Sequence, residues 1–165
     1  MRSSIIIKVA GTISILSMGI ANAWNNGQGL TPPMGWTNTY AFGKALTEDI
    51  VMQTANYMNT TGILDAGYKI IALGDGWQND ARESNGDLLA NPSRFPNGMA
   101  NLGTKLKGMG FSLGVSSSPG KTTCMNSLPG SEGYESKDAS NYASWGVSFL
   151  NYYNCGNDQP ALDSY

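Results

Sequence analysis

Short apolar runs alternate along this chain with longer segments in which apolar residues recur every three or four positions. The short runs are typical of buried strands, and the three-to-four spacing is typical of helices. The pattern predicts strands at residues 30–36, 68–73, 111–115 and 147–152. It predicts helices at residues 47–62, 99–109 and 134–145, so that each strand but the last is followed by a helix.

The predicted helices have recognisable ends. Thr47 is expected to cap the first helix, with Glu48 and Asp49 in the first turn, where the helix dipole favours acidic groups. A glycine, Gly110, is expected to end the second helix. The inward positions are expected to be Ile50, Val51, Ala55 and Met58 in the first helix, Met99, Leu102, Leu106 and Met109 in the second, and Ala139, Tyr142 and Ala143 in the third. The acidic residues Glu48, Asp49, Glu135 and Asp138 are expected on solvated faces.

Apolar strands that alternate with helices predict an α/β fold with a parallel sheet. Two architectures remain open, a (β/α)₈ TIM-like barrel and an open doubly wound sheet. No Gly-x-Gly-x-x-Gly motif follows the first strand, which counts against a dinucleotide site. A complete barrel takes about 250 residues. The predicted elements therefore amount to half a barrel, with four parallel strands and three helices.

The first 23 residues have the pattern of a secretory signal peptide. Arg2 and Lys8 precede an apolar run, which ends at the small-residue cleavage pattern of residues 21–23. We therefore expect a secreted protein with one domain at residues 24–165. The apolar run is shorter than the roughly 20 residues of a membrane span, and no later stretch qualifies, so no membrane partner is expected.

Composition removes further classes of function. The chain of 165 residues has 12 acidic and 10 basic residues, a net charge of −2, and no basic patch, so nucleic acid is not an expected partner. It has no histidine, which excludes histidine-based triads and metal sites. In a secreted chain the two cysteines, Cys124 and Cys155, are expected to form a disulfide. Asn59 begins the sequon Asn-Thr-Thr and is a candidate glycosylation site.

Function in parallel α/β folds collects where the strands end. The four predicted ends hold one carboxylate, Asp75. They also hold aromatic residues that could line a sugar-sized cleft: Trp36, Tyr40, Trp77, Tyr152 and Tyr153. Each has a structural alternative, because Asp75 could bond backbone N–H groups in a turn and the aromatic rings could simply pack. The serine run at 116–118 has no base to activate a nucleophile.

Several ordered motifs resemble the α-galactosidases of glycoside hydrolase family 27. They are Thr-Pro-Pro-Met-Gly-Trp at 31–36, Asp-Ala-Gly-Tyr at 65–68, Arg-Phe-Pro-Asn-Gly-Met at 94–99, and the segment 144–155 that ends in Tyr-Tyr-Asn-Cys. The resemblance implies a (β/α)₈ catalytic barrel, secretion, and retaining hydrolysis of terminal α-galactosides without a metal or organic cofactor.

The resemblance carries over to the site only in part. It implies substrate-binding roles for Trp36, Asp75 and Trp77. The family's catalytic nucleophile, an aspartate, corresponds to Tyr153, and the acid/base carboxylate belongs to a later strand. Cys124 and Cys155 match one family disulfide, while the positions of a second one are Lys44 and Gly76, so that both partners are replaced.

Three hypotheses follow. The first is a secreted α-galactosidase-like homologue that has lost catalysis. The second is a non-catalytic protein that holds a galactoside weakly through Asp75 and the tryptophans. The third is an interaction protein, in which the two exposed edges of a half-barrel sheet pair with a protein partner or with a second copy in a homodimer.

Overall fold

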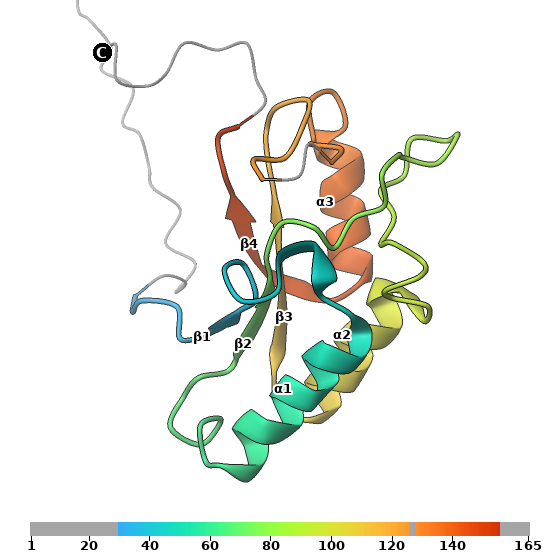
Figure 1. Cartoon of the computed structure of the whole chain (residues 1–165). Coiled ribbons are helices and arrows are strands. Elements are labelled where there is room, and N and C mark those ends of the chain that lie inside the picture. Colours follow the sequence, from blue (N-terminus) through green and yellow to red (C-terminus); the bar gives the residue numbers. More distant parts are fainter. Residues whose placement is uncertain (1–29, 126–127, 156–165) are drawn as a thin grey trace, which may run out of the picture. The chain divides into compact units, whose positions relative to one another are not determined.

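The computed structural model describes residues 30–125 and 128–155, and the predicted signal peptide at 1–23 lies outside this range. The chain divides after Thr31, and the fold described below is that of the unit that begins at Pro32. Its elements are β1 (Gly35–Thr37), the short 3-10 helix η1 (Gly43–Ala45), α1 (Glu48–Thr60), β2 (Ile70–Leu73), α2 (Gly98–Gly108), β3 (Ser112–Ser117), α3 (Glu135–Ser144) and β4 (Val147–Tyr152) (Figure 1).

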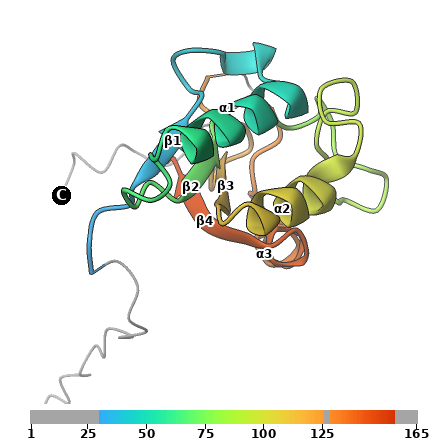
Figure 2. The same ribbon diagram turned by 90° about the horizontal axis from the view of Figure 1, so that it is seen from below.

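The four described strands form one parallel sheet in the order β1-β2-β3-β4. The three α-helices lie on the same face of this sheet (Figures 1 and 2). A doubly wound sheet would reverse its strand order at a switch point and carry helices on both faces. The consecutive order and the single helical layer decide between the two predicted architectures, and the described part of the chain is half of a (β/α)₈ barrel.

The core lies between the sheet and the helices. Alternate residues of a strand point to opposite faces, and the helix-facing set is apolar. It consists of Ile71 and Leu73 from β2, Leu113 and Val115 from β3, Val51 and Ala55 from α1, and Leu102 and Leu106 from α2, all buried. One continuous hydrophobic cluster therefore holds the sheet and the helices together. Burial of apolar surface stabilises a fold by about 25 cal/mol for each Å² removed from water.

The predicted ends of the first two helices are confirmed. The Thr47 hydroxyl accepts a hydrogen bond from Ile50 N at 3.3 Å and caps α1. Gly110 has a φ of +91° directly after α2, a conformation that glycine adopts readily. Within the described residues, no helix is long and apolar enough to cross a membrane.

The first strand is shorter than predicted and starts later. The expected strand at 30–36 is observed as Gly35–Thr37, because Pro32 and Pro33 before it have no N–H to give to a sheet. A side chain at Gly35 would lie 2.2 Å from the Ile70 carbonyl oxygen, so the close approach of β1 to β2 requires glycine there. The third strand runs two residues past its predicted end, and Ser116 and Ser117 belong to β3 instead of a loop.

The inward face of the third helix was predicted wrongly. Tyr142 is buried as expected, but Ala139 and Ala143 are exposed and Asp138 is buried in their place. The prediction that Glu48 is solvated is also wrong, whereas Asp49 and Glu135 are exposed as expected. Both buried acids have cationic partners on distant segments, which a local pattern does not reveal.

The last strand occupies the predicted residues but is not buried. In β4 the residues alternate between half-buried and exposed, and Leu150 keeps 42 % of its surface exposed. Among the described strands, β4 is at an edge of the sheet and pairs only with β3.

Candidate functional site at the carboxyl ends of the strands

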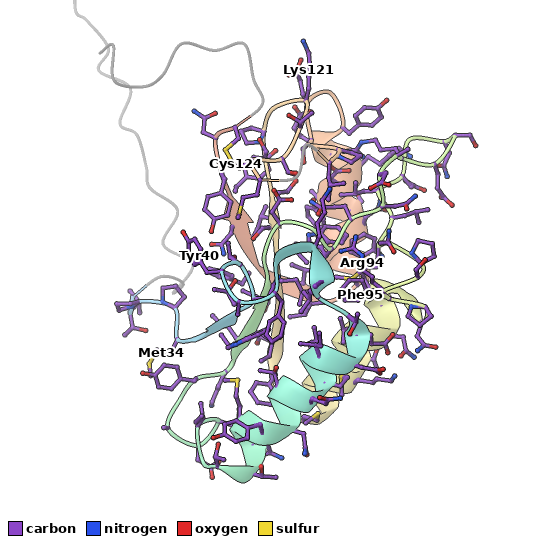
Figure 3. The ribbon with its side chains drawn as sticks, viewed as in Figure 1. Met34, Tyr40, Arg94, Phe95, Lys121 and Cys124 are labelled. Atoms are coloured by element: carbon purple, nitrogen blue, oxygen red, sulfur yellow. A yellow bond between two sulfur atoms is a disulfide. The ribbon has the colours of Figure 1, made fainter. Side chains whose placement is uncertain are left out.

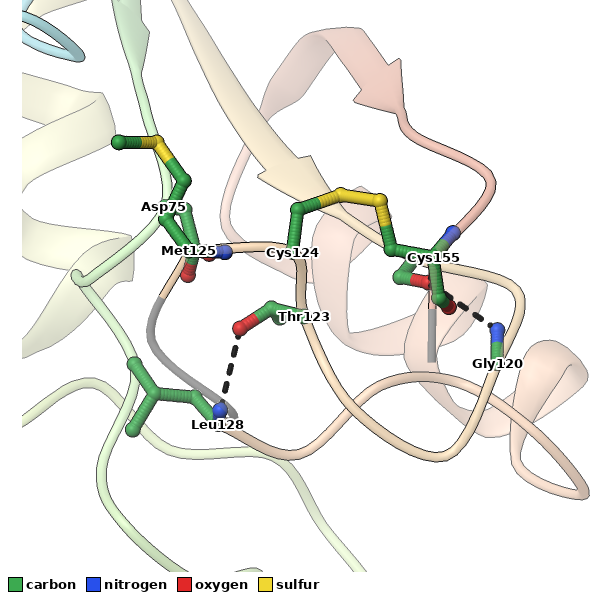
Figure 4. The surroundings of a disulfide bond; sticks show 8 residues. Asp75, Gly120, Thr123, Cys124, Met125, Leu128 and Cys155 are labelled. Carbon is green, nitrogen blue, oxygen red and sulfur yellow. Dashed lines mark hydrogen bonds between the residues drawn. A yellow bond between two sulfur atoms is a disulfide. The ribbon is translucent and has the colours of Figure 1, made fainter. Parts of the chain in front are cut away.

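The carboxyl ends of the parallel strands meet at one edge of the sheet, which is the upper edge in Figure 1. Asp75 lies there, between Gly74 and Gly76, and is buried. Its Oδ2 accepts a hydrogen bond from Met125 N at 2.7 Å, so the carboxylate joins the end of β2 to the loop that follows β3 (Figure 4). The donor lies 50 residues along the chain, so this bond joins two loops and is not the local turn bond that the sequence analysis offered as an alternative.

The two tryptophans assigned to substrate binding lie in different surroundings. Trp77 has no exposed surface, its Nε1 donates to Ser116 O at 2.9 Å, and its ring meets Tyr142 and Trp145 edge to face. In this arrangement the Trp77 indole fills the core and has no face open to a sugar. Trp36 is half-buried and packs against Phe42 with the ring centres 6.2 Å apart.

Tyr153, which the resemblance aligns with the family's nucleophile, follows β4. Its N–H donates to Ser117 O at 3.0 Å, which extends the β3–β4 pairing, and its side chain is 45 % exposed. The predicted disulfide is present two residues later, between Cys155 and Cys124, with a Cα–Cα distance of 5.1 Å (Figure 4). The disulfide therefore fixes the loop after β3 against the end of β4.

Asp75 and Tyr153 line one narrow space, and neither Trp36 nor Trp77 borders it. It is lined by Asp75, Ser116, Ser117, Thr123, Cys124 and Tyr153. As bounded by these described residues, it has no room for a water molecule. Asp75 supplies the one carboxylate among them, whereas retaining glycosidases use two carboxyl groups about 5–5.5 Å apart. Among the described residues, this space therefore holds one phenol, that of Tyr153, and one carboxylate, that of Asp75.

Two structural residues at this edge escaped the sequence analysis. Asn38 is fully buried after β1, and its Oδ1 accepts from Gly74 N at 2.7 Å, which joins the ends of β1 and β2. Arg94 donates to the carbonyl oxygens of Gly76 and of Lys44, the latter at 2.8 Å (Figure 3). Lys44 and Gly76 are the positions where the resemblance placed a missing disulfide, so one guanidinium connects the two segments that the disulfide would join.

The outer part of the loops is fixed by a buried ion pair. Arg82, in the loop after β2, forms two hydrogen bonds to the Asp138 carboxylate of α3, at 2.6 and 2.7 Å. It also donates to Gly86 O at 3.0 Å and Gly130 O at 2.7 Å. Burial alone would lower the pKa of Arg82, but the bonds to Asp138 raise it, so the guanidinium stays charged. Within the described residues, no cluster of three acidic or cysteine side chains is placed to hold a metal ion.

The candidate glycosylation residue lies away from this edge. Asn59 is exposed in the last turn of α1, at the opposite ends of the strands. A glycan at Asn59 would be compatible with the fold and would leave the carboxyl ends of the strands clear.

Comparison with known proteins places the fold and its motifs in one family. The family profile described as alpha galactosidase A matches residues 31–164. The α-galactosidase of Cyamopsis tetragonoloba is 43 % identical over 132 residues, which cover 80 % of this chain and 32 % of the relative.

Solved structures of α-galactosidases have a fold similar to that of this chain. The chain resembles α-galactosidase I from Mortierella vinacea with a TM-score of 0.78 and 37 % identity, over 81 % of this chain and 34 % of that one. It resembles the α-galactosidase from Saccharomyces cerevisiae, solved with raffinose, with a TM-score of 0.77 and 42 % identity, over 80 % of this chain and 29 % of that one. The chain spans about a third of the length of these relatives. By sequence and by fold, it belongs to the α-galactosidase family of glycoside hydrolases and corresponds to the N-terminal part of that family's barrel.

Proposed function

We propose that this chain is a secreted member of the α-galactosidase family that does not hydrolyse α-galactosides. The proposal rests on Tyr153, which the resemblance aligns with the aspartate nucleophile of the family. A phenol has a pKa of about 10 and is protonated at neutral pH, so it needs a base before it can attack a sugar. The one carboxylate lining the same space, Asp75, already accepts a backbone hydrogen bond.

Secretion is the second part of the proposal. It is supported by the signal-peptide pattern at residues 1–23 and by the Cys124–Cys155 disulfide, since disulfides persist mainly in oxidising compartments. Expression of the full chain in a secreting host should release protein that begins at Trp24, as read by N-terminal sequencing. Retention inside the cell with an intact Met1 would contradict it.

The loss of catalysis is tested with p-nitrophenyl α-D-galactopyranoside. The purified chain should release no nitrophenol above buffer, while the Cyamopsis tetragonoloba enzyme assayed in parallel should turn over. Saturable hydrolysis that Tyr153→Phe abolishes would overturn the proposal. Hydrolysis that Tyr153→Phe leaves unchanged would come either from a different residue of this chain or from a co-purified enzyme. Repeated purification distinguishes the two, because only a contaminating enzyme would be removed by it.

A partner-binding role is the second candidate, and the open edge of β4 favours it. Leu150, Tyr152 and Tyr153 are each more than 40 % exposed along that edge. On the sheet face away from the helices, a hollow of about 220 Å³ is bordered by Ile70, Ala72 and Phe149. In a homodimer, β4 of each copy would pair with β1 of the other and these faces would cover each other. Light scattering on the full chain tests this, and a monomer at all concentrations would contradict it.

Weak galactoside binding at the strand ends remains the third candidate. The relative from Saccharomyces cerevisiae was solved with raffinose, and Trp36 and Asp75 keep the family's residue types. Because the space at Asp75 has no room for a water molecule, binding there requires the residues that line it to rearrange. Galactose should raise the melting temperature of the chain, and glucose should not. In Asp75→Ala, galactose should leave the melting temperature unchanged. No galactose-dependent shift would remove this candidate.

A further inference from the structure

A second, open cleft lies outside the space at the strand ends. It has a volume of about 420 Å³, within the roughly 300–1,000 Å³ typical of small-molecule sites. Its walls are the loops that follow β2 and β3, and it is called the outer cleft below. The polar and aromatic residues that line it are Asp80, Arg82, Lys121, Thr122, Glu132 and Tyr134. It therefore shares the functional edge of the sheet without sharing a lining residue with the closed space.

The walls of the outer cleft are held in place by hydrogen bonds. Arg82 ties the loop after β2 to Asp138 and to Gly130 O in the opposite wall. The opposite wall has its own backbone bonds, from Gly130 N to Lys121 O at 2.9 Å and from Glu132 N to Gly120 O at 3.2 Å. A cleft whose walls are already ordered loses little conformational entropy when a ligand enters.

One wall carries an aromatic ring. Tyr134 lines the cleft and keeps 41 % of its surface exposed. The Arg82 guanidinium covers one face of this ring, 4.1 Å from its centre, so a ligand would contact the part of Tyr134 that stays exposed. A partly exposed ring offers an apolar surface with a hydroxyl at its end, a combination suited to the mixed apolar and polar surface of a sugar.

The charges of the outer cleft select against an anion. Both terminal nitrogens of Arg82 are engaged by Asp138 and by backbone carbonyls, so this cation is neutralised within the protein. The remaining charged side chains are the carboxylates of Asp80 and Glu132 and the ammonium of Lys121. Carboxylates accept hydrogen bonds and repel anions. The lining suits a neutral ligand that is rich in hydroxyl groups.

From this geometry we infer that the outer cleft is a saccharide-binding site. A pyranose ring rests against Tyr134, and its hydroxyls donate to Glu132 and Asp80. The site needs no catalytic group and no opening of the space at Asp75. It is therefore independent of the proposed loss of catalysis and of galactoside binding at the strand ends.

Calorimetric titration of the full chain with raffinose tests the site. Tyr134→Leu removes the ring, and Glu132→Gln removes a carboxylate but keeps its size. Tyr57→Leu, which removes an exposed ring on α1 far from the cleft, is the matched control. Asp75→Asn reports on the strand-end site. A parallel titration with a galactose-terminated glycopeptide compares free saccharides with saccharides carried on a protein. A titration with inorganic phosphate tests whether the cleft binds an anion instead.

The expected result is saturable saccharide binding that Tyr134→Leu and Glu132→Gln each weaken by about tenfold or more. Tyr57→Leu should leave it unchanged, and Asp75→Asn should remove only binding at the strand ends. Either saccharide source would support the site, with the tighter one identifying the preferred form. No saturable binding, tighter binding of phosphate, or binding lost only in Asp75→Asn would overturn it. If Tyr134→Leu does not melt cooperatively, an unchanged affinity in Glu132→Gln is sufficient to overturn it.

Discussion

The buried ion pair between Arg82 and Asp138 gives the sharpest prediction about stability. The Asp138 side chain is 1 % exposed and that of Arg82 is 11 % exposed. Asp138→Ala removes two charge-assisted hydrogen bonds and leaves a guanidinium with little access to water. Removing one partner of a buried pair costs about 3–5 kcal/mol, because the other charge stays buried without compensation. That is a large part of the roughly 5–15 kcal/mol that holds a typical domain folded.

The same helix provides the control. Lys137 of α3 pairs with Asp87 at 3.0 Å, and the two side chains are 41 % and 31 % exposed. Because water screens exposed pairs, Lys137→Ala should change stability little. Arg82→Lys should fall between the two, since it keeps a charge but loses the two-pronged geometry.

Urea unfolding followed by circular dichroism measures all three variants. The expected outcome is a large fall in the midpoint for Asp138→Ala, a smaller one for Arg82→Lys, and no resolved change for Lys137→Ala, with similar slopes throughout. A loss of less than about 1 kcal/mol for Asp138→Ala would refute the assignment of this pair as a buried clamp.

Three further predictions use the same measurement. Burial alone would raise the pKa of Glu48, but hydrogen bonds from Lys105 and Asn97 lower it below 4.5. The contribution of Glu48 to stability should therefore be fully present above pH 4.5 and should be lost as acid protonates the carboxylate. Glu48→Gln should reduce this dependence of stability on pH. Reducing the disulfide, or Cys124→Ser, should cost about 3–4 kcal/mol for an interval of 31 residues, and an unchanged midpoint would contradict this. Gly103→Ala should lower the free energy of unfolding by about 1–3 kcal/mol, because its Cβ would lie 2.2 Å from Trp145 O. Gly108→Ala should raise the free energy of unfolding by up to about 1 kcal/mol, because no neighbouring atom lies within 4 Å of the added Cβ. Equal effects of the two variants would refute the packing argument.

The regular elements were predictable because their signals are local. The apolar runs predicted four strands, and Thr47 and Gly110 marked the start of α1 and the end of α2 to within two residues. The third helix shows the limit of this reasoning. Ala139 and Ala143 have the spacing of an inward face, yet the helix turns Asp138 inward because Arg82, 56 residues away in the chain, satisfies its charge.

The sequence predicted where the candidate site lies in the fold, but not whether the space there has room for a ligand. Strand order alone brought Asp75 and Tyr153 to one edge of the sheet, and the structure confirms that they line the same space. The hydrogen bond from Met125 N to Asp75 beside this space joins residues 50 positions apart in the chain. The roles of Asn38 and Arg94 likewise depend on backbone groups far along the chain, which no residue pattern encodes.

The central claim, that the nucleophile is lost at Tyr153, is tested most directly by covalent trapping. A fluorinated galactosyl fluoride forms a long-lived glycosyl adduct with the nucleophile of a retaining α-galactosidase, and intact-mass spectrometry detects it. The chain should keep its mass after incubation, while the Cyamopsis tetragonoloba enzyme in the same experiment should gain one fluorogalactosyl group. A stoichiometric adduct on this chain, mapped to Tyr153, would contradict the account.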